Sequence, residues 1–210
     1  MKGKQKCKEK LQQTFQLPIR SDLPLFATIS RFATQKGLDV FAESLSSLLA
    51  TEDFQFVIIG CGDKNLENWY NSFQQQYPEK IAVFTGFASD AVSHLTEAGA
   101  DFFVMPSRYE PCGLNQMYSM RYGTLPIVRR TGGLADTVIS YDHSNPEKAT
   151  GFAFWDLYAD SLAQTIRWAA SVRKNNPQDF HQMIVNAMNK DFSWNHTASQ
   201  YERMYQDAHR

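Results

Sequence analysis

The chain has 210 residues, of which 43% are hydrophobic and 13% aromatic, and its formal net charge is −1 at pH 7. A chain of this size and composition can bury the core of one domain without disulfide bonds. The balanced charge argues against a nucleic-acid partner, since nucleic-acid-binding domains usually carry a strong basic excess.

The first 17 residues predict a helix that leads into the domain, exposed to solvent because five lysines fall among the first ten residues. This segment lacks the apolar stretch of a signal peptide, and no apolar run in the chain reaches the length of a membrane span. The three cysteines are widely separated and form no C-x-x-C pair, which is typical of proteins from reducing compartments. We therefore expect a cytoplasmic protein with no membrane partner and no structural zinc.

Five apolar runs of strand length predict a sheet: Leu25–Ile29, Phe54–Ile59, Ile81–Phe84, Asp101–Met105 and Leu125–Val128. Each run is followed by a glycine or polar turn and then by a helical pattern, which suits βαβ units. The runs lack polar alternation, as expected for strands buried on both faces of a parallel sheet. We predict an α/β fold, a Rossmann-like doubly wound parallel sheet with helices on both faces, whose functional loops lie beyond the carboxyl ends of the strands.

The end of the chain reads as helical. Helices are predicted from Asp160 or Ser161 to about residue 175, from Pro177 to about 190, and from Ser193 to Ala208. One face of the last helix carries an apolar stripe made of Trp194, Ala198, Tyr201, Met204, Tyr205 and Ala208. Two interpretations are open: the stripe packs on the domain, or it is a docking face for something this chain lacks. No internal repeat or linker divides the sequence, so we expect a single domain over residues 1–210.

The loop after the first strand carries two cations, Arg31 and Lys36, ahead of a helix start. A phosphate leaving group needs such cations because its negative charge grows as the bond to the sugar breaks; the alternative is that both are merely solvated. The turn after the second strand has Asn65 where a dinucleotide-binding fingerprint needs its third glycine, which argues against NAD. After the third strand, Gly86 is followed by Phe87, whose ring can stack on a base or cap the core.

The loop after the fourth strand carries one carboxylate, Glu110. It lies just ahead of Gly113, where we expect a helix to begin and to run through Arg121. The N–H groups of Gly113 and Leu114 would point at an anion. Glu110 would accept hydrogen bonds from sugar hydroxyls. Alternatively, its negative charge would only stabilise the N-terminus of this helix through the helix dipole.

The fifth strand leads to a donor-rich loop, Thr131, Gly132 and Gly133, that can wrap phosphates with backbone amides. Together the loops predict one crevice for a sugar attached to phosphates. The chain has no D-x-D pair for holding a metal against a diphosphate. We therefore expect positive charge and helix dipoles to neutralise the leaving group, with no metal and no other cofactor.

Four runs resemble the C-terminal half of bacterial glycogen synthases and plant starch synthases, which are retaining glucosyltransferases of GT-B fold. They are SRFATQKGLD at 30–39, PSRYEPCGLNQ at 106–116, YGTLPIVRRTGGLADTV at 122–138 and DFSW at 191–194. The resemblance implies that Arg31 and Lys36 contact the donor diphosphate and that Glu110 lies at the glucose end of the cleft. It also implies that the donor site is lined by Cys112, Gly113, Leu114, Thr131, Gly132 and Gly133, with Gly86 and Phe87 near the base. The chain departs from the family at Asn115, where Thr is usual, and at Tyr109, where Phe is usual.

The reaction implied by the resemblance is transfer of glucose from ADP-glucose to the non-reducing end of an α-1,4-glucan with retention. Family enzymes bind the acceptor through an N-terminal domain that these 210 residues do not supply, so this chain alone is expected to be inactive. The helical tail, residues 192–210, would dock on that domain and leave Tyr201 and Tyr205 exposed here. Two alternatives from other classes are a nucleotide-sugar-binding module without catalysis and an interaction protein with a decayed site.

Overall fold

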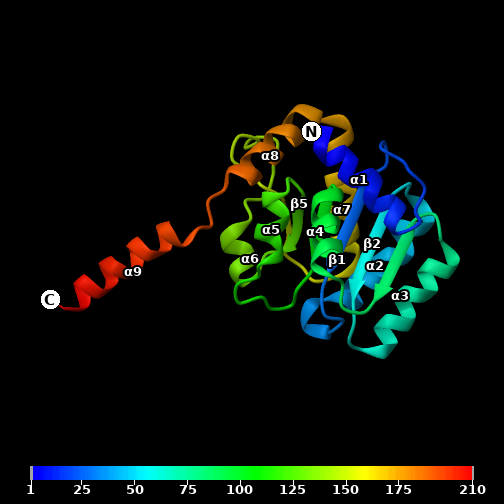
Figure 1. Ribbon diagram of the computed structural model, residues 1–210, viewed down its shortest axis with the longest axis horizontal. Helices are drawn as coiled ribbons and strands as arrows, with labels where there is room; N and C mark the ends of the chain where they lie inside the picture. Colours follow the sequence, from blue (N-terminus) through cyan, green and yellow to red (C-terminus); the bar gives the residue numbers. More distant parts are fainter. Residues whose placement is uncertain (1, 210) are drawn as a thin grey trace.

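The structure is a computed structural model that describes residues 2–209 (Figure 1). Six parallel strands form one sheet: β1 (Leu25–Ile29), β2 (Gln55–Gly60), β3 (Ile81–Thr85), β4 (Phe102–Met105), β5 (Leu125–Arg129) and β6 (Phe152–Phe154). Their order across the sheet is β3-β2-β1-β4-β5-β6. The five predicted strands are confirmed to within one residue at each end. The sixth was missed because three residues are too short a run to stand out as an apolar pattern.

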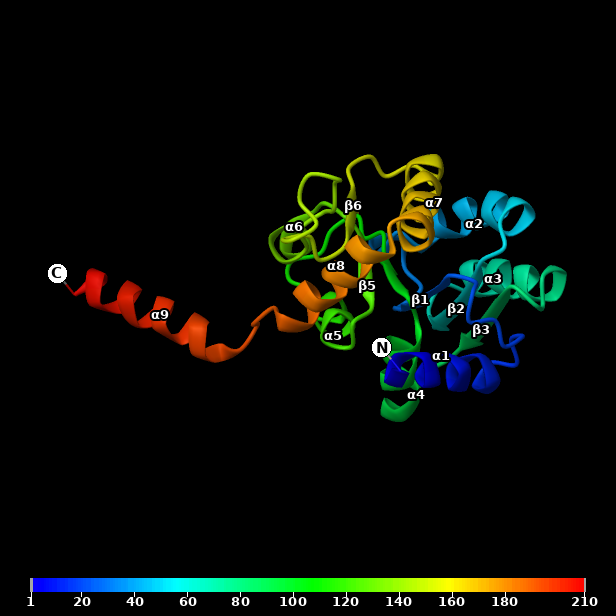
Figure 2. The same ribbon diagram turned by 90° about the horizontal axis from the view of Figure 1, so that it is seen from above.

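The helices are α1 (Lys2–Thr14), α2 (Leu38–Thr51), α3 (Lys64–Gln76), α4 (Asp90–Gly99), α5 (Asn115–Arg121), α6 (Gly132–Thr137), α7 (Ala159–Asn175), α8 (Pro177–Asn189) and α9 (Trp194–Ala208), with a 3-10 turn η1 (Thr34–Lys36) before α2. In β1 to β4, alternate residues point to opposite faces of the sheet and enter two separate cores. Phe26 and Phe56 enter a core shared with α2, α3 and α7, whereas Ala27 and Val57 enter one shared with α1 and α4. Figure 2 shows these helices on the two sides of the sheet, which confirms the doubly wound, Rossmann-like prediction.

The first helix belongs to the body of the domain. Leu11 is fully buried, and the Lys8 ammonium lies 2.6 Å from the Asp101 carboxylate and donates to the Leu23 carbonyl. The prediction that this helix is solvated is therefore wrong. A lysine can bury its aliphatic stem when its ammonium finds a carboxylate, and that partner lies far away in the sequence.

The last helix projects away from the body of the molecule (Figures 1 and 2). Tyr201 and Tyr205 are 48% and 61% exposed. The interpretation that the stripe packs on this domain is therefore wrong, because no other part of the described chain covers these rings. Docking on a further domain stays a prediction.

Candidate functional site

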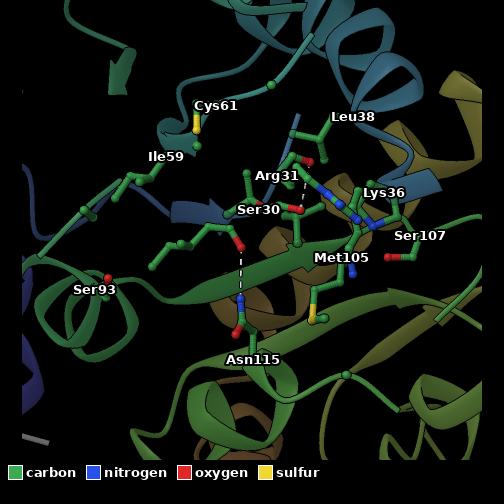
Figure 3. Close-up of a pocket in the computed structure, with 18 of the residues that line it drawn as sticks. Ser30, Arg31, Lys36, Leu38, Ile59, Cys61, Ser93, Met105, Ser107 and Asn115 are labelled. Atoms are coloured by element: carbon green, nitrogen blue, oxygen red, sulfur yellow. Dashed lines mark hydrogen bonds between the residues drawn. The ribbon is translucent and has the colours of Figure 1, made fainter. Parts of the chain in front are cut away.

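A cavity of about 760 Å³ opens beyond the carboxyl ends of β1 and β4 (Figure 3). These two strands are neighbours, and the strand order reverses between them. Ile29 at the end of β1 and Met105 at the end of β4 line it, together with Ser30 and Pro106, which directly follow these strands. Parallel α/β sheets bind ligands at such a reversal point, because the flanking crossovers leave to opposite faces and open a crevice. The volume is that of a small-molecule site.

Lys36 and Glu110 meet directly inside this crevice. The Lys36 Nζ lies 2.5 Å from Glu110 Oε2, and the Ser107 hydroxyl lies 3.3 Å from the same oxygen. Glu110 is only 6% exposed, so these partners replace hydrogen bonds that water would otherwise supply to the carboxylate. The sequence predicted both residues for the site, and the structure adds that the cation pairs with the carboxylate. Arg31 also lines the cavity and is exposed.

Gly37 makes the approach of Lys36 possible. Its φ of +66° follows the η1 turn, and a Cβ at this position would collide with the Pro106 carbonyl. Only glycine combines this left-handed conformation with so close a backbone contact. The loop after β1 can therefore lie against the loop after β4, which places Lys36 beside Glu110.

The loop after β5 contacts the backbone of the loop that carries Glu110. The Gly133 N–H donates to the Glu110 carbonyl at 3.0 Å, and a Cβ at Gly133 would collide with the Cys112 carbonyl. The Gly133 amide, which we expected to contact a phosphate, is therefore paired within the chain, and its contact with a donor stays a prediction. Thr131, Gly132, Gly133 and Cys112 do not line the cavity. Contact of Thr131, Gly132 and Cys112 with a donor stays a prediction.

Helix α5 begins later than predicted. Its first residue is Asn115, with Leu114 at the N-cap and Gly113 at φ +72°. The left-handed φ of Gly113 keeps this residue out of the helix, which explains the two-residue difference. Gly113 and Leu114 nevertheless line the cavity. The Asn115 amide donates to the Ile29 carbonyl at 2.9 Å and so ties the start of α5 to the end of β1 (Figure 3).

The third loop supplies the exposed ring. Phe87 is 93% exposed and lines the cavity together with Gly86. The alternative that this ring caps the core is therefore wrong. Stacking on a base stays a prediction, and the exposed face of the ring is the feature that such stacking needs.

Two supporting contacts escaped the sequence analysis. The buried Gln116 donates through Nε2 to the carbonyls of Cys112 and Gly113, which holds the turn ahead of α5. Arg108 forms two hydrogen bonds of 2.6 Å with Asp39 on α2. Burial raises the pKa of Asp39, but the hydrogen bonds and charge of Arg108 outweigh it and hold the pKa of this carboxyl below its usual range. Gln116 shares the buried face of α5 with Ser119 and Met120, so no apolar pattern in the sequence singled it out.

Few charged side chains line the crevice. In the part of the chain that the structure describes, Glu110 is the one carboxylate among the lining residues, beside the cations Arg31 and Lys36. Among the side chains that the structure describes, no group of three or more His, Cys, Asp or Glu is placed to hold a metal ion. Within residues 2–209, every helix is too short or too polar to cross a membrane. The arrangement is suited to an anionic ligand that carries a polyol.

Comparison with known proteins gives a consistent result. The family described as "Glycosyl transferases group 1" matches residues 9–189. Glycogen synthase 1 of Geobacter metallireducens is 46% identical over 205 residues, which cover 98% of this chain and 40% of that protein. Starch synthase 1 of Triticum aestivum is 41% identical over 210 residues, which cover 99% of this chain and 32% of that protein.

A solved structure matches as well. The catalytic domain of starch synthase IV from Arabidopsis thaliana, bound to ADP and acarbose, has a TM-score of 0.86 and 30% identity, and the match covers 97% of this chain and 42% of that one. The chain thus spans about two-fifths or less of the length of these relatives.

Proposed function

Because this chain belongs to the group 1 glycosyl transferases, we propose that it is the donor-binding half of a glycogen or starch synthase. The observation that carries the proposal is the crevice between β1 and β4, where Arg31, Lys36 and Glu110 line one cavity. Relatives named as glycogen and starch synthases match 98% and 99% of the chain. The reaction is transfer of glucose from ADP-glucose to the non-reducing end of an α-1,4-glucan with retention.

The donor lies with its diphosphate against Arg31 and Lys36. Arg31 offers a planar fork of donors and Lys36 a compact charge, and both suit phosphate oxygens. The adenine ring lies near Gly86 and Phe87, and the glucose lies at the Glu110 end. The starch synthase IV structure, which contains ADP, supports this choice of nucleotide.

The chemistry depends on the leaving group. As the bond between glucose and the diphosphate breaks, its electron pair moves to the phosphate oxygen, where Arg31 and Lys36 stabilise the growing charge. The acceptor hydroxyl attacks from the same face and passes its proton to the departing phosphate, which retains the configuration. Glu110 orients the sugar by accepting hydrogen bonds from its hydroxyls. The two cations take the part that a divalent metal plays in other transferases.

The acceptor is bound with the help of an N-terminal domain outside these 210 residues, so this chain alone does not elongate glucans. The tail, residues 192–210, docks on that domain. We also expect the protein to act in the cytoplasm, in keeping with three cysteines that form no disulfide.

Calorimetric titration of the chain with ADP-glucose and with UDP-glucose, each with and without magnesium, tests the donor half of the proposal. We expect ADP-glucose to bind more tightly, with the same affinity in both buffers. Arg31→Gln should weaken binding about ten- to hundredfold, the effect of losing one hydrogen bond to a charged group. Arg20→Gln removes an exposed arginine outside the crevice and should change nothing. Failure of the unaltered chain to bind either nucleotide sugar would refute the proposal.

A second experiment separates an enzyme half from a binding module. The chain is mixed with a separately made N-terminal half of a family enzyme, and glucan elongation from ADP-glucose is assayed. Elongation above that of either half supports the enzyme. Donor binding without elongation supports a non-catalytic module.

A further inference from the structure

Three exposed aromatic side chains lie beyond the strand ends but outside the cavity. Tyr109 follows β4, and Trp155 and Tyr158 follow β6; they are 59%, 66% and 71% exposed. All strands are parallel, so these residues share the carboxyl edge of the sheet with the cavity. We name Tyr109, Trp155 and Tyr158 the edge aromatics. Exposed aromatic side chains that lie at one edge of a sheet indicate an interaction site, because they do not pack in the core.

One arginine draws the two loops together. Arg129, at the end of β5, donates through Nη1 to the Arg108 carbonyl at 2.7 Å and through Nε to the Trp155 carbonyl at 3.3 Å. The backbone next to Tyr109 and the backbone of Trp155 therefore meet at a single guanidinium. The strands β4 and β6 flank β5 and lie two strand spacings apart, about 10 Å. The edge aromatics thus begin one residue away from Glu110.

The indole of Trp155 is held in place. The Arg130 guanidinium lies 4.6 Å from its ring centroid, which is a cation–π contact. Trp155 nevertheless remains 66% exposed. A ring that is already oriented loses less conformational entropy when a ligand stacks on it.

The surroundings of the rings favour a carbohydrate over a protein. Carboxylates lie near the aromatic rings along the chain: Asp156 directly follows Trp155, Asp160 lies two residues after Tyr158, and both carboxylates are exposed. A stable protein interface needs about 800 Å² of surface on each partner, with charges kept to its rim. A sugar ring instead has a C–H face that stacks on the electron-rich face of an aromatic ring. Its hydroxyls are met by carboxylates and a guanidinium.

We propose that the edge aromatics bind the α-glucan acceptor chain, and so form an acceptor subsite on this domain. The inference rests on the proposed function and names a second ligand contact for it. Trp155 carries the stacking, Tyr158 extends it, and Arg130 orients the indole. Because Tyr109 directly precedes Glu110, a glucan lying across these rings reaches the crevice at its glucose end.

The test titrates the 210-residue chain with maltoheptaose, with binding followed by calorimetry. Trp155→Ala should weaken binding about ten- to thirtyfold, as expected when a central aromatic contact is truncated. Tyr158→Ala should weaken it less. Trp194→Ala, which removes an exposed indole from α9, is the matched control and should leave the affinity unchanged. Equal affinity of the Trp155→Ala variant and the unaltered chain, or no maltoheptaose binding by the unaltered chain, would overturn the subsite.

A second arm keeps this test distinct from that of the proposed function. The same proteins are titrated with ADP-glucose, and Trp155→Ala should bind it like the unaltered chain, which also shows that the variant is folded. Loss of ADP-glucose binding in the unaltered chain would count against the donor site, whatever maltoheptaose does. If Trp155→Ala keeps maltoheptaose binding but no longer associates with the N-terminal half, the patch is a protein contact and the subsite is wrong.

Discussion

Lys36 has two roles that two measurements on the same variants can distinguish: it pairs with Glu110, and we assign it to the donor diphosphate. Lys36→Met removes the ammonium but keeps most of the volume of the side chain. It leaves Glu110 with only the 3.3 Å contact from Ser107 in a buried position. It also removes one of the two cations that we assign to the donor diphosphate. We therefore expect a loss of stability and, separately, a loss of donor affinity.

The structure sets the size of both effects. Removing one member of a buried ion pair costs about 3–5 kcal/mol. The Lys36 side chain is 24% exposed and that of Glu110 8%, so water reaches the pair and we expect about 2–3 kcal/mol. In a chain of this length this corresponds to a fall in Tm of about 4–12 °C. Loss of a hydrogen bond to a charged phosphate costs about 1.5–3 kcal/mol, or about ten- to hundredfold in Kd.

Thermal unfolding and ADP-glucose titration of three variants provide the assay: Lys36→Met, Glu110→Gln and the double variant. The double variant should be more stable than the sum of the two single losses predicts, because no charge is then left buried and unpaired. Lys64→Met breaks another Lys–Glu pair, that with Glu67, but the Lys64 side chain is 81% exposed. This control should lower the free energy of unfolding by less than about 1 kcal/mol.

Strict additivity of the single substitutions would refute the claim that the pair is coupled. Unchanged ADP-glucose affinity in Lys36→Met would refute the assignment of Lys36 to the diphosphate. In the full-length enzyme, Lys36→Ala should lower turnover by orders of magnitude, and near-normal turnover would contradict its role.

Three further predictions concern stability. Gly37→Ala should lower Tm and donor affinity together, because the left-handed φ and the Pro106 carbonyl leave no room for a Cβ; Gly3→Ala, with nothing within 4 Å, is the control and should leave Tm the same or higher. Burial lowers the pKa of Lys4 to about 8 from 10.5, so the unfolded chain binds more protons between these values, and stability should rise with pH across that window. Denaturant unfolding at pH 7.5, 9 and 10 checks this rise, which Lys4→Met should reduce; an unchanged slope would contradict the assignment. Deleting residues 191–210 should leave Tm nearly unchanged, and a fall of more than about 4 °C would show that α9 stabilises the domain.

The sequence predicted much of the fold because its signals are local. Apolar runs that lack polar alternation marked β1 to β5, and the intervening helical patterns required parallel strands with crossovers. A parallel sheet places the functional loops at one edge, so the grouping of Arg31, Lys36 and Glu110 followed from the pattern. The three-residue strand β6 gave no such signal, so the position of Trp155 at a strand end was missed.

The roles of particular side chains depended on contacts between distant residues. The solvent exposure expected for α1 was wrong because the partner of Lys8 is Asp101, 93 residues along the chain. The Gly133 amide, expected to contact a phosphate, donates to the Glu110 carbonyl. Helical periodicity described the apolar stripe of α9 correctly, but periodicity does not say what a stripe packs against.

By itself, the sequence predicted which residues we assign to the chemistry and on which loops they lie, since residue type and strand boundaries are local properties. The tertiary structure alone decided that Lys36 pairs with Glu110. These residues are 74 positions apart, and they meet because β1 lies beside β4 in a sheet whose order differs from the order of the chain. Strand order is set by how the whole set of apolar faces is buried, and no single stretch of the sequence contains that information.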